Sequence, residues 1–471
     1  MLSEETLFLP LSELARRIES KKLSPVELTE SYLARSQKFG PALNAYALLT
    51  PDIALEQAHK AEKEIRGGHY RGSLHGMPYA AKDLLAVKGL PTTWGAKPYA
   101  SQVFDHDAAV ITNLKRAGAV LLGKSAMIEL AGGSSYRFAS ASLTGAAKNP
   151  WNTSCWTCGS SSGSGAIMAA GLAAFTLGSE TWGSILCPAA FCGVSGLRPT
   201  YGRVSRFGAM ALAYSLDKIG PLCRTAEDCA RVFAVIAGHD LRDRATLPLD
   251  KAAFTYSPAT ERRPPQRIGL LTNAWKSLPP ELAALLADAR KILRRSFPFV
   301  GNAALPTGPF EDAANLIMSS ECASAFADLL RSGGAAQLAD PLEQLSVYVS
   351  ETIPAADYLA ALRIREQLQY KMEELFDSFD ILATVSLPIT ATSLDLNMET
   401  GWNFPDPLGA IGNLCGLPAI SVPCGFAPDG LPVGLQFVGR AGNDLGVIQA
   451  ARAYQKYTGW HRKRPKLAAA V

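Results

Sequence analysis

The sequence predicts an α/β protein with a mixed, mostly parallel central sheet that is covered by helices on both faces. Short apolar strands alternate along the chain with capped or amphipathic helices, which is the pattern of such sheets. With 471 residues, 48% of them hydrophobic, the chain can bury a large core. We see no internal repeat, so we expect a single domain over residues 1–471. Within it, a mainly helical, lid-like subregion is expected at about 240–380.

The N-terminal part carries clear local signals. One apolar face recurs at helical spacing and comprises Leu11, Leu14, Ala15 and Ile18. Ser24, followed by Pro25 and by Glu27 three residues on, forms a capping box. This box predicts a helix that continues to about Arg35.

The same rules predict the later elements. Strands are expected at Met77–Ala81, Ala119–Gly123 and Arg267–Leu271. Helices are expected at Asp107–Ala117, from a cap at Thr225 to Gly238, at about Pro280–Ser296 and at Phe310–Arg331. The polar, proline-bearing stretch from Leu241 to Gln266 predicts a surface excursion that leads into the lid-like helices.

Two clusters of serine and glycine lie between Cys158 and Thr200, one at Ser160–Ser164 and one around Ser184. Ordering so much glycine costs backbone entropy, so the pattern indicates a place where the backbone must come close to a ligand. Serines on such turns suggest hydroxyl groups used as reagents, with backbone amides ready for an anion. No histidine lies between His106 and His239, so the base must come from elsewhere.

Lys82 is the candidate base, because it ends the apolar strand predicted at residues 77–81. Poor solvation at that position would lower its pKa and leave a neutral amine. The alternative is a strand-end lysine whose ammonium group reaches solvent.

Four blocks carry a resemblance to a known family: GMPYAAKD, NPWNTSCWTCGSSSGSG, GSETWGSILCPAAFCGVSGLRPTYGRVSRFG and SLDKIGPLCRTAEDCA. In these blocks the chain resembles the amidase signature family. The resemblance implies that Lys82 is the catalytic lysine and that Ser184 is the nucleophile. It also implies that Ser160 is the bridging serine, preceded by a cis peptide bond.

The resemblance further implies how the reaction proceeds. Neutral Lys82 would take a proton from Ser160, which takes one from Ser184 as that oxygen attacks an amide carbonyl. The backbone N–H groups of Thr181, Trp182, Gly183 and Ser184 would form the oxyanion hole. Candidate substrate-binding residues are Gly132, Gly133, Ser134, Trp182 and Ile185.

The chain departs from the family pattern at two positions beside the nucleophile. Trp182 replaces a glycine, and three interpretations are open: its indole lines the substrate pocket, packs outward, or distorts the oxyanion hole. Leu186 replaces an arginine that would pair with the acid at 180. Glu180 must therefore be supported by another cation or by backbone donors.

The nine cysteines are predicted to be reduced thiols, because their number is odd and no secretion signal precedes them. Packing is the expected role of Cys158. Cys155-x-x-Cys158 lacks a second pair and a nearby histidine, so no metal is expected. No cofactor is expected either.

Charge and hydropathy restrict the partners that we expect. The net charge of +4 is small for the length, and no basic stripe points to nucleic acid. No run reaches the ~18 apolar residues of a membrane span. We expect a cytoplasmic monomer or homodimer whose partner is a small-molecule, amide-type substrate.

Three function hypotheses follow. The first is a stand-alone hydrolase of amides, anilides or carbamates, favouring apolar or aromatic uncharged substrates because Leu186 stands where an arginine could meet a carboxylate. The second is the glutaminase-type subunit of a tRNA amidotransferase. The third is a non-catalytic scaffold with the same fold.

Overall fold

A computed structural model describes residues 1–133, 135–248, 266–402 and 404–467 of the chain. In this part, one 11-stranded sheet crosses the molecule. Its strands, from one edge to the other, are β1 (Tyr46–Leu49), β3 (Val120–Ser125), β2 (Pro78–Lys82), β6 (Phe175–Glu180), β8 (Lys218–Cys223), β7 (Ser195–Arg198), β12 (Ala419–Phe426), β13 (Pro432–Gly439), β11 (Ile381–Val385), β9 (Arg267–Leu271) and β10 (Phe299–Ala303). A separate small sheet pairs β4 (Lys148–Asn149) with β5 (Asn152–Trp156).

The sheet is mixed, as predicted, but antiparallel pairs outnumber parallel ones in the described residues. Strand β2 runs parallel to β3 and β6, and β9 runs parallel to β10 and β11. The central strands β6, β8, β7, β12 and β13 pair antiparallel with one another. Strands β12 and β13 form a hairpin whose turn contains Gly430 at φ 79°. The other antiparallel pairs of the main sheet join strands that are connected by longer segments of the chain.

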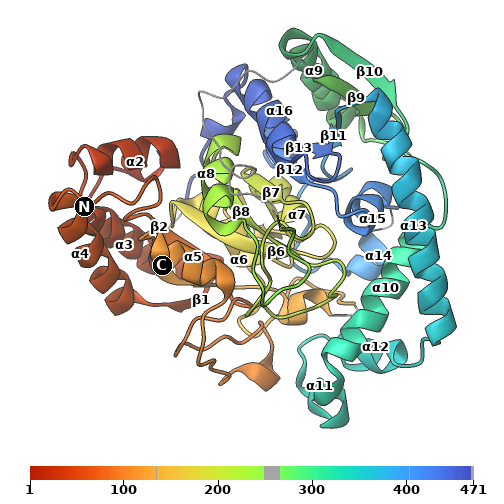
Figure 1. The fold of residues 1–471 in the computed structure, drawn as a ribbon, viewed down its shortest axis with the longest axis horizontal. Helices are drawn as coiled ribbons and strands as arrows, with labels where there is room; N and C mark the ends of the chain where they lie inside the picture. The colour runs from red at the N-terminus through yellow and green to blue at the C-terminus, as the bar shows by residue number, and fades with distance from the viewer. Residues whose placement is uncertain (134, 249–265, 403, 468–471) are drawn as a thin grey trace.

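Helices flank the sheet, and Figure 1 shows α2–α4 at one end of the molecule and α10–α13 at the other. The α-helices of the described residues are α1 (Glu4–Leu7), α2 (Leu11–Glu19), α3 (Pro25–Leu43), α4 (Pro51–Arg66), α5 (Ala109–Arg116), α6 (Ser162–Ala170), α7 (Leu186–Cys192), α8 (Ala226–Ile236), α9 (Pro280–Ser296), α10 (Phe310–Ala325), α11 (Ala327–Arg331), α12 (Glu343–Ser350), α13 (Ala355–Ser378), α14 (Met398–Gly401), α15 (Pro407–Leu414) and α16 (Asp444–Lys456). None of them combines the length and the apolar character that a membrane span requires.

The local sequence signals are confirmed in most places. The four apolar residues of the first predicted face are buried in α2. Ser24 accepts hydrogen bonds from the backbone of Val26 and Glu27, although α3 continues to Leu43, beyond the expected end. Thr225 caps α8 as predicted.

The region from 240 to 380 contributes strands as well as helices. Strand β9 and helix α9 have the predicted bounds, and the predicted helix at Phe310–Arg331 is divided at Phe326 into α10 and α11. Strands β9 and β10 extend the edge of the main sheet. Residues 249–265 of the predicted surface excursion lie outside the described residues, and the single-domain organisation stays a prediction.

The sheet order places the candidate catalytic residues together. Strands β2 and β6 are parallel neighbours, so their carboxyl ends meet at one edge. Lys82 ends β2, and Glu180 ends β6 just before the turn that carries Ser184. The candidate relay lysine and the turn with the candidate nucleophile therefore lie on neighbouring strand ends.

Candidate active site

Lys82 contacts two serine hydroxyls in a fully buried position. Its Nζ lies 2.7 Å from Oγ of Ser160 and 2.9 Å from Oγ of Ser179. The Ser160 contact is the one that the family resemblance implied. The Ser179 contact was not anticipated, because no sequence motif marked that position.

Burial lowers the pKa of Lys82 to about 7, although the charges of Asp217 and Glu180 act in the opposite direction. The neighbouring acid, Asp83, does not pair with Lys82: it forms an ion pair with Lys124 at 2.9 Å and accepts hydrogen bonds from Thr93. Among the described residues, no carboxylate lies within ion-pair distance of Lys82. A neutral amine next to Ser160 is therefore accessible near neutral pH.

The turn that carries Ser160 is held against strand β6. The peptide bond between Gly159 and Ser160 is cis, as the resemblance implied. Ser161 donates from its Oγ to the carbonyl of Ser179 and from its backbone N–H to the carbonyl of Ser184 at 3.4 Å. At Gly163 a Cβ would overlap backbone atoms of neighbouring segments, so only glycine allows this close approach.

The nucleophile turn joins β6 to α7. Ser184 is 7% exposed, and Gly183 adopts φ 77°, which favours glycine. Within the described ranges, no oxygen accepts a hydrogen bond from the backbone N–H of Thr181, Trp182, Gly183 or Ser184. These four groups are the predicted oxyanion donors. The hydroxyls of Ser160 and Ser184 share no hydrogen bond in this structure.

The Glu180 carboxylate is supported by a cation and by backbone donors, both of which the sequence left open. Its Oε2 accepts hydrogen bonds from the backbone N–H groups of Ile185 and Leu186, at 2.9 and 3.1 Å. Its Oε1 accepts one from Nη1 of Arg198 at 2.8 Å, and both side chains are buried. Burial alone would raise the pKa of Glu180, but the nearby charges of Arg198 and Lys218 hold it below its usual value.

Trp182 points toward helix α15. Its indole Nε1 donates a hydrogen bond to Oδ2 of Asp406, whose Oδ1 caps α15 at Gly409. The indole is half-buried, and a Cβ at Gly409 would overlap its nitrogen. Trp182 does not have a positive φ, so its backbone does not need the conformation that only glycine tolerates. This speaks against the interpretation in which Trp182 distorts the oxyanion hole.

The predicted substrate-binding residues fall into different environments. Gly132 and Gly133 lie in a loop where Ser135 N–H donates to the Glu343 carboxylate, and a Cβ at Gly133 would overlap that carboxylate. Ser134 lies outside the described residues. Ile185 is fully buried in a core cluster with Met168, Ala189 and Leu222, so its side chain faces the core. Contact of Ile185 with the substrate stays a prediction.

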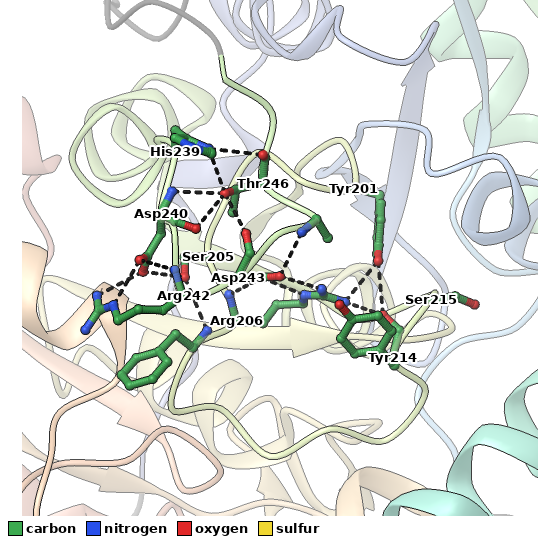
Figure 2. Close-up of polar contacts among 12 residues, drawn as sticks. Tyr201, Ser205, Arg206, Tyr214, Ser215, His239, Asp240, Arg242, Asp243 and Thr246 are labelled. Atoms are coloured by element: carbon green, nitrogen blue, oxygen red, sulfur yellow. Dashed lines mark hydrogen bonds and ion pairs between the residues drawn. The ribbon is translucent and has the colours of Figure 1, made fainter.

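A cavity of about 450 Å³ adjoins this centre and is lined by Ser179, Thr181 and Asp217. Thr181 donates from Oγ1 to Asp217 at 2.5 Å, and burial raises the pKa of Asp217. Arg206, Arg242 and Asp243 also line this cavity, and Figure 2 shows that Arg206 pairs with Asp243 and Arg242 with Asp240. The charges of these two arginines are thus largely neutralised by carboxylates.

Two cysteines beside the candidate site form a disulfide, so the prediction that all thiols are reduced is wrong. The bond joins Cys158 to Cys187, and Cys158 is therefore more than a packing residue. The pairing was missed because an odd number of cysteines does not exclude one pair. In the described part of the chain, no group of three or more histidine, cysteine or acidic side chains could hold a metal ion.

Comparison with known proteins gives matches over nearly the whole length. A model of the family described as Amidase matches residues 27–448. The chain is 36% identical to a glutamyl-tRNA(Gln) amidotransferase subunit of Methylococcus capsulatus, with 97% of this chain and 98% of that protein covered. It is similar in structure to the peptide amidase of Stenotrophomonas maltophilia (31% identity, TM-score 0.83, 97% and 98% of the two chains covered). It is also similar to the corresponding glutamyl-tRNA(Gln) amidotransferase subunit of Thermotoga maritima (28% identity, TM-score 0.79, 97% and 96% covered).

These relatives correct the expectation about partners. We expected a chain that acts on a small molecule alone, without nucleic acid, as a monomer or homodimer. The relatives are named as one subunit of an enzyme for glutamyl-tRNA(Gln). Net charge and composition do not reveal whether a chain works as one subunit of a larger enzyme.

Replacing Arg198 by alanine should destabilise the protein strongly, because the buried Glu180 would lose the cation that is bonded directly to it. Breaking a buried ion pair in this way costs about 3–5 kcal/mol of unfolding free energy. Urea unfolding of the Arg198→Ala variant measures this. The control is Arg331→Ala, which removes an arginine from an exposed pair and should leave the curve unchanged. Equal stability of the two variants would contradict the support that we assign to Arg198.

Proposed function

Because the chain belongs to the amidase family, we propose that it hydrolyses an amide C–N bond through an acyl-enzyme on Ser184, with Ser160 and Lys82 as the proton relay. One observation carries this proposal. Nζ of Lys82 lies 2.7 Å from Ser160 in a fully buried setting that lowers the pKa of the lysine to about 7. A base of that pKa is matched to proton transfer at neutral pH.

In the proposed reaction, the Ser184 oxygen attacks the carbonyl carbon while its proton passes to Ser160, whose own proton passes to Lys82. The backbone N–H groups of residues 181–184 stabilise the oxyanion. Among the described residues, none of these N–H groups donates a hydrogen bond to an oxygen. Lys82 then returns the proton through Ser160 to the leaving nitrogen, since an amide anion is a poor leaving group. Water hydrolyses the acyl-enzyme by the same relay.

The first candidate for the physiological role is the glutaminase-type subunit of a tRNA amidotransferase. The relatives that support it are named as subunits of glutamyl-tRNA(Gln) amidotransferase, and they match 97–99% of this chain at 35–36% identity. In this role the amide would be the side chain of glutamine. The chain would then act together with other subunits.

The second candidate is a stand-alone hydrolase of uncharged amides, anilides or carbamates. The hydrogen bond between Trp182 and Asp406 favours this candidate. The indole N–H uses one oxygen of the Asp406 carboxylate, so that oxygen is not left for a charged group of the substrate. Leu186, buried where the family pattern has an arginine, adds no cation for a substrate carboxylate. Both features favour an uncharged, apolar substrate.

The proposed roles of Ser184 and Lys82 predict how much kcat falls when each residue is replaced by alanine. Ser184→Ala should lower kcat by at least about 10⁴-fold, because no nucleophile remains. Lys82→Ala should approach the same loss, since the relay then has no base. Ser162→Ala is the matched control, because this neighbouring serine has no role in the relay, and it should stay within a few-fold of the parent. Undiminished kcat in Ser184→Ala would refute the acyl-enzyme.

The pH profile should report the neutral form of Lys82. Below its pKa of about 7 the amine is protonated and cannot accept a proton, so log kcat/KM should fall by one for each pH unit lost. Above that pKa the rate should level off. The measurement is kcat/KM of the parent protein from pH 5.5 to 9. A flat profile across this interval would point to a different base.

A substrate panel separates the two candidates. We expect the chain to hydrolyse glutamine with a kcat/KM at least about tenfold above that for acetanilide or an aryl carbamate, as the amidotransferase relatives suggest. The assay uses the purified chain on each substrate and measures released ammonia or amine. Preference for the anilide, with indifference to glutamine, would instead select the stand-alone hydrolase.

The same panel applied to Trp182 variants tests where the indole acts. If the indole lines the pocket, Trp182→Gly should change the ranking of substrates by about 10–200-fold, the scale of a lost pocket contact. Trp182→Phe keeps an aromatic ring but removes the indole N–H that donates to Asp406. This variant therefore distinguishes the effect of the ring's shape from the effect of its hydrogen bond. An unchanged ranking with a lowered melting temperature would mean that the indole only packs.

A further inference from the structure

The disulfide between Cys158 and Cys187 joins the two turns that carry the candidate serines. Cys158 lies two residues before Ser160, and Cys187 lies three residues after Ser184, in the first turn of α7. Both cysteines are buried, with exposed fractions of 2% and 6%. A covalent bond thus joins the segments that carry the two candidate hydroxyls.

Few hydrogen bonds join the two turns directly in the described residues, although Ser161 is also bonded to Ser179 in the strand that leads to Ser184. Ser161 N–H donates to the Ser184 carbonyl at 3.4 Å, which is long for such a bond. The Cys192 thiol contacts the Thr157 carbonyl at 3.8 Å, and a thiol is a weak donor. The disulfide is therefore the strongest connection between these segments in the described structure.

The backbone at Cys158 supports a specific use of this side chain. Cys158 adopts φ 63°, a conformation that costs free energy for any residue with a Cβ and that glycine adopts freely. Cysteine at such a position is costly unless its side chain does something that glycine cannot. Here the sulfur reaches Cys187, which gives that reason.

We propose that the Cys158–Cys187 disulfide positions the Ser160 turn against the Ser184 turn, and that its reduction slows acylation of Ser184 without unfolding the protein. This inference rests on the acyl-enzyme of the proposed function. A dithiol performs the reduction: it gives two electrons and two protons to the disulfide, which becomes two thiols, and the dithiol closes to its own disulfide. The relay then loses the fixed separation between its two hydroxyl groups.

The state of the bond is measured first. The chain has nine cysteines, and two of them form the disulfide, so seven thiols remain outside it. Thiol titration of the denatured protein should therefore give seven before treatment with dithiothreitol and nine after it. A count of nine in protein purified without reductant would overturn the proposal.

The positioning role is measured by the rate at which a fluorophosphonate labels Ser184. In the reduced protein, and in Cys187→Ser and Cys158→Gly variants, the maximal labelling rate should fall by about 10–100-fold, the effect of a small misplacement of reacting groups. The concentration for half-maximal labelling should change less than about threefold. The variants do not depend on entry of the reductant into a buried site, and Cys158→Gly relieves the backbone cost at that position.

Cys155→Ser is the matched control, since this nearby cysteine is free and half-buried. With the disulfide intact, the Cys155→Ser variant should be labelled at the rate of the parent protein. On reduction, its labelling rate should fall by the same factor as that of the parent. A lower melting temperature with an unchanged labelling rate would show a merely stabilising bond and would overturn the positioning role. No labelling of Ser184 in either redox state would overturn the proposed function itself, which distinguishes the two failures.

Discussion

The buried Glu180 carboxylate is the constraint on which the candidate active site depends. It ends strand β6 and accepts hydrogen bonds from the first N–H groups that follow Ser184 along the chain. Those bonds close the turn and leave the N–H groups of residues 181–184 without an acceptor among the described residues. Arg198 supplies the charge that keeps this carboxylate ionised out of water. The turn with the candidate oxyanion donors and the candidate nucleophile is thus closed, up to the start of α7, by hydrogen bonds to this one carboxylate.

The pKa of Lys82 depends on how the charged side chains around it are paired. Lys82 and Asp83 are adjacent in sequence and alternate in direction at the end of β2, so Asp83 turns to Lys124 instead. Lys82 is left with two neutral hydroxyls, and nothing at ion-pair distance among the described residues stabilises its charged form. Burial then dominates, and the pKa of the lysine falls toward neutrality. The strand pleat thus separates Lys82 from Asp83, and Lys124, on the neighbouring strand β3, takes the carboxylate as its partner.

Local and family-wide signals predicted much of this arrangement, whereas contacts between distant segments escaped prediction. The Ser24 cap, strand β9 and helix α9 depend on neighbouring residues, and the family resemblance is confirmed over residues 27–448. The partners of Glu180 and Trp182 lie 18 and 224 residues away along the chain, where periodicity carries no information. For Glu180, the sequence showed that support was missing but not that Arg198 supplies it. The sequence likewise ranked a stand-alone hydrolase first, whereas the full-length relatives favour the role within an amidotransferase.

The bond between Trp182 and Asp406 has a consequence for how the protein is made. The two residues are separated by 224 positions, and Asp406 belongs to the segment that begins α15 near the C-terminal end. At roughly 5–20 residues per second, translation reaches Asp406 about 10–45 s after Trp182. During that interval the nascent chain carries its serine turn without this anchor. The turn that carries Ser184 therefore gains this contact only after translation has passed Asp406, when most of the chain has already been made.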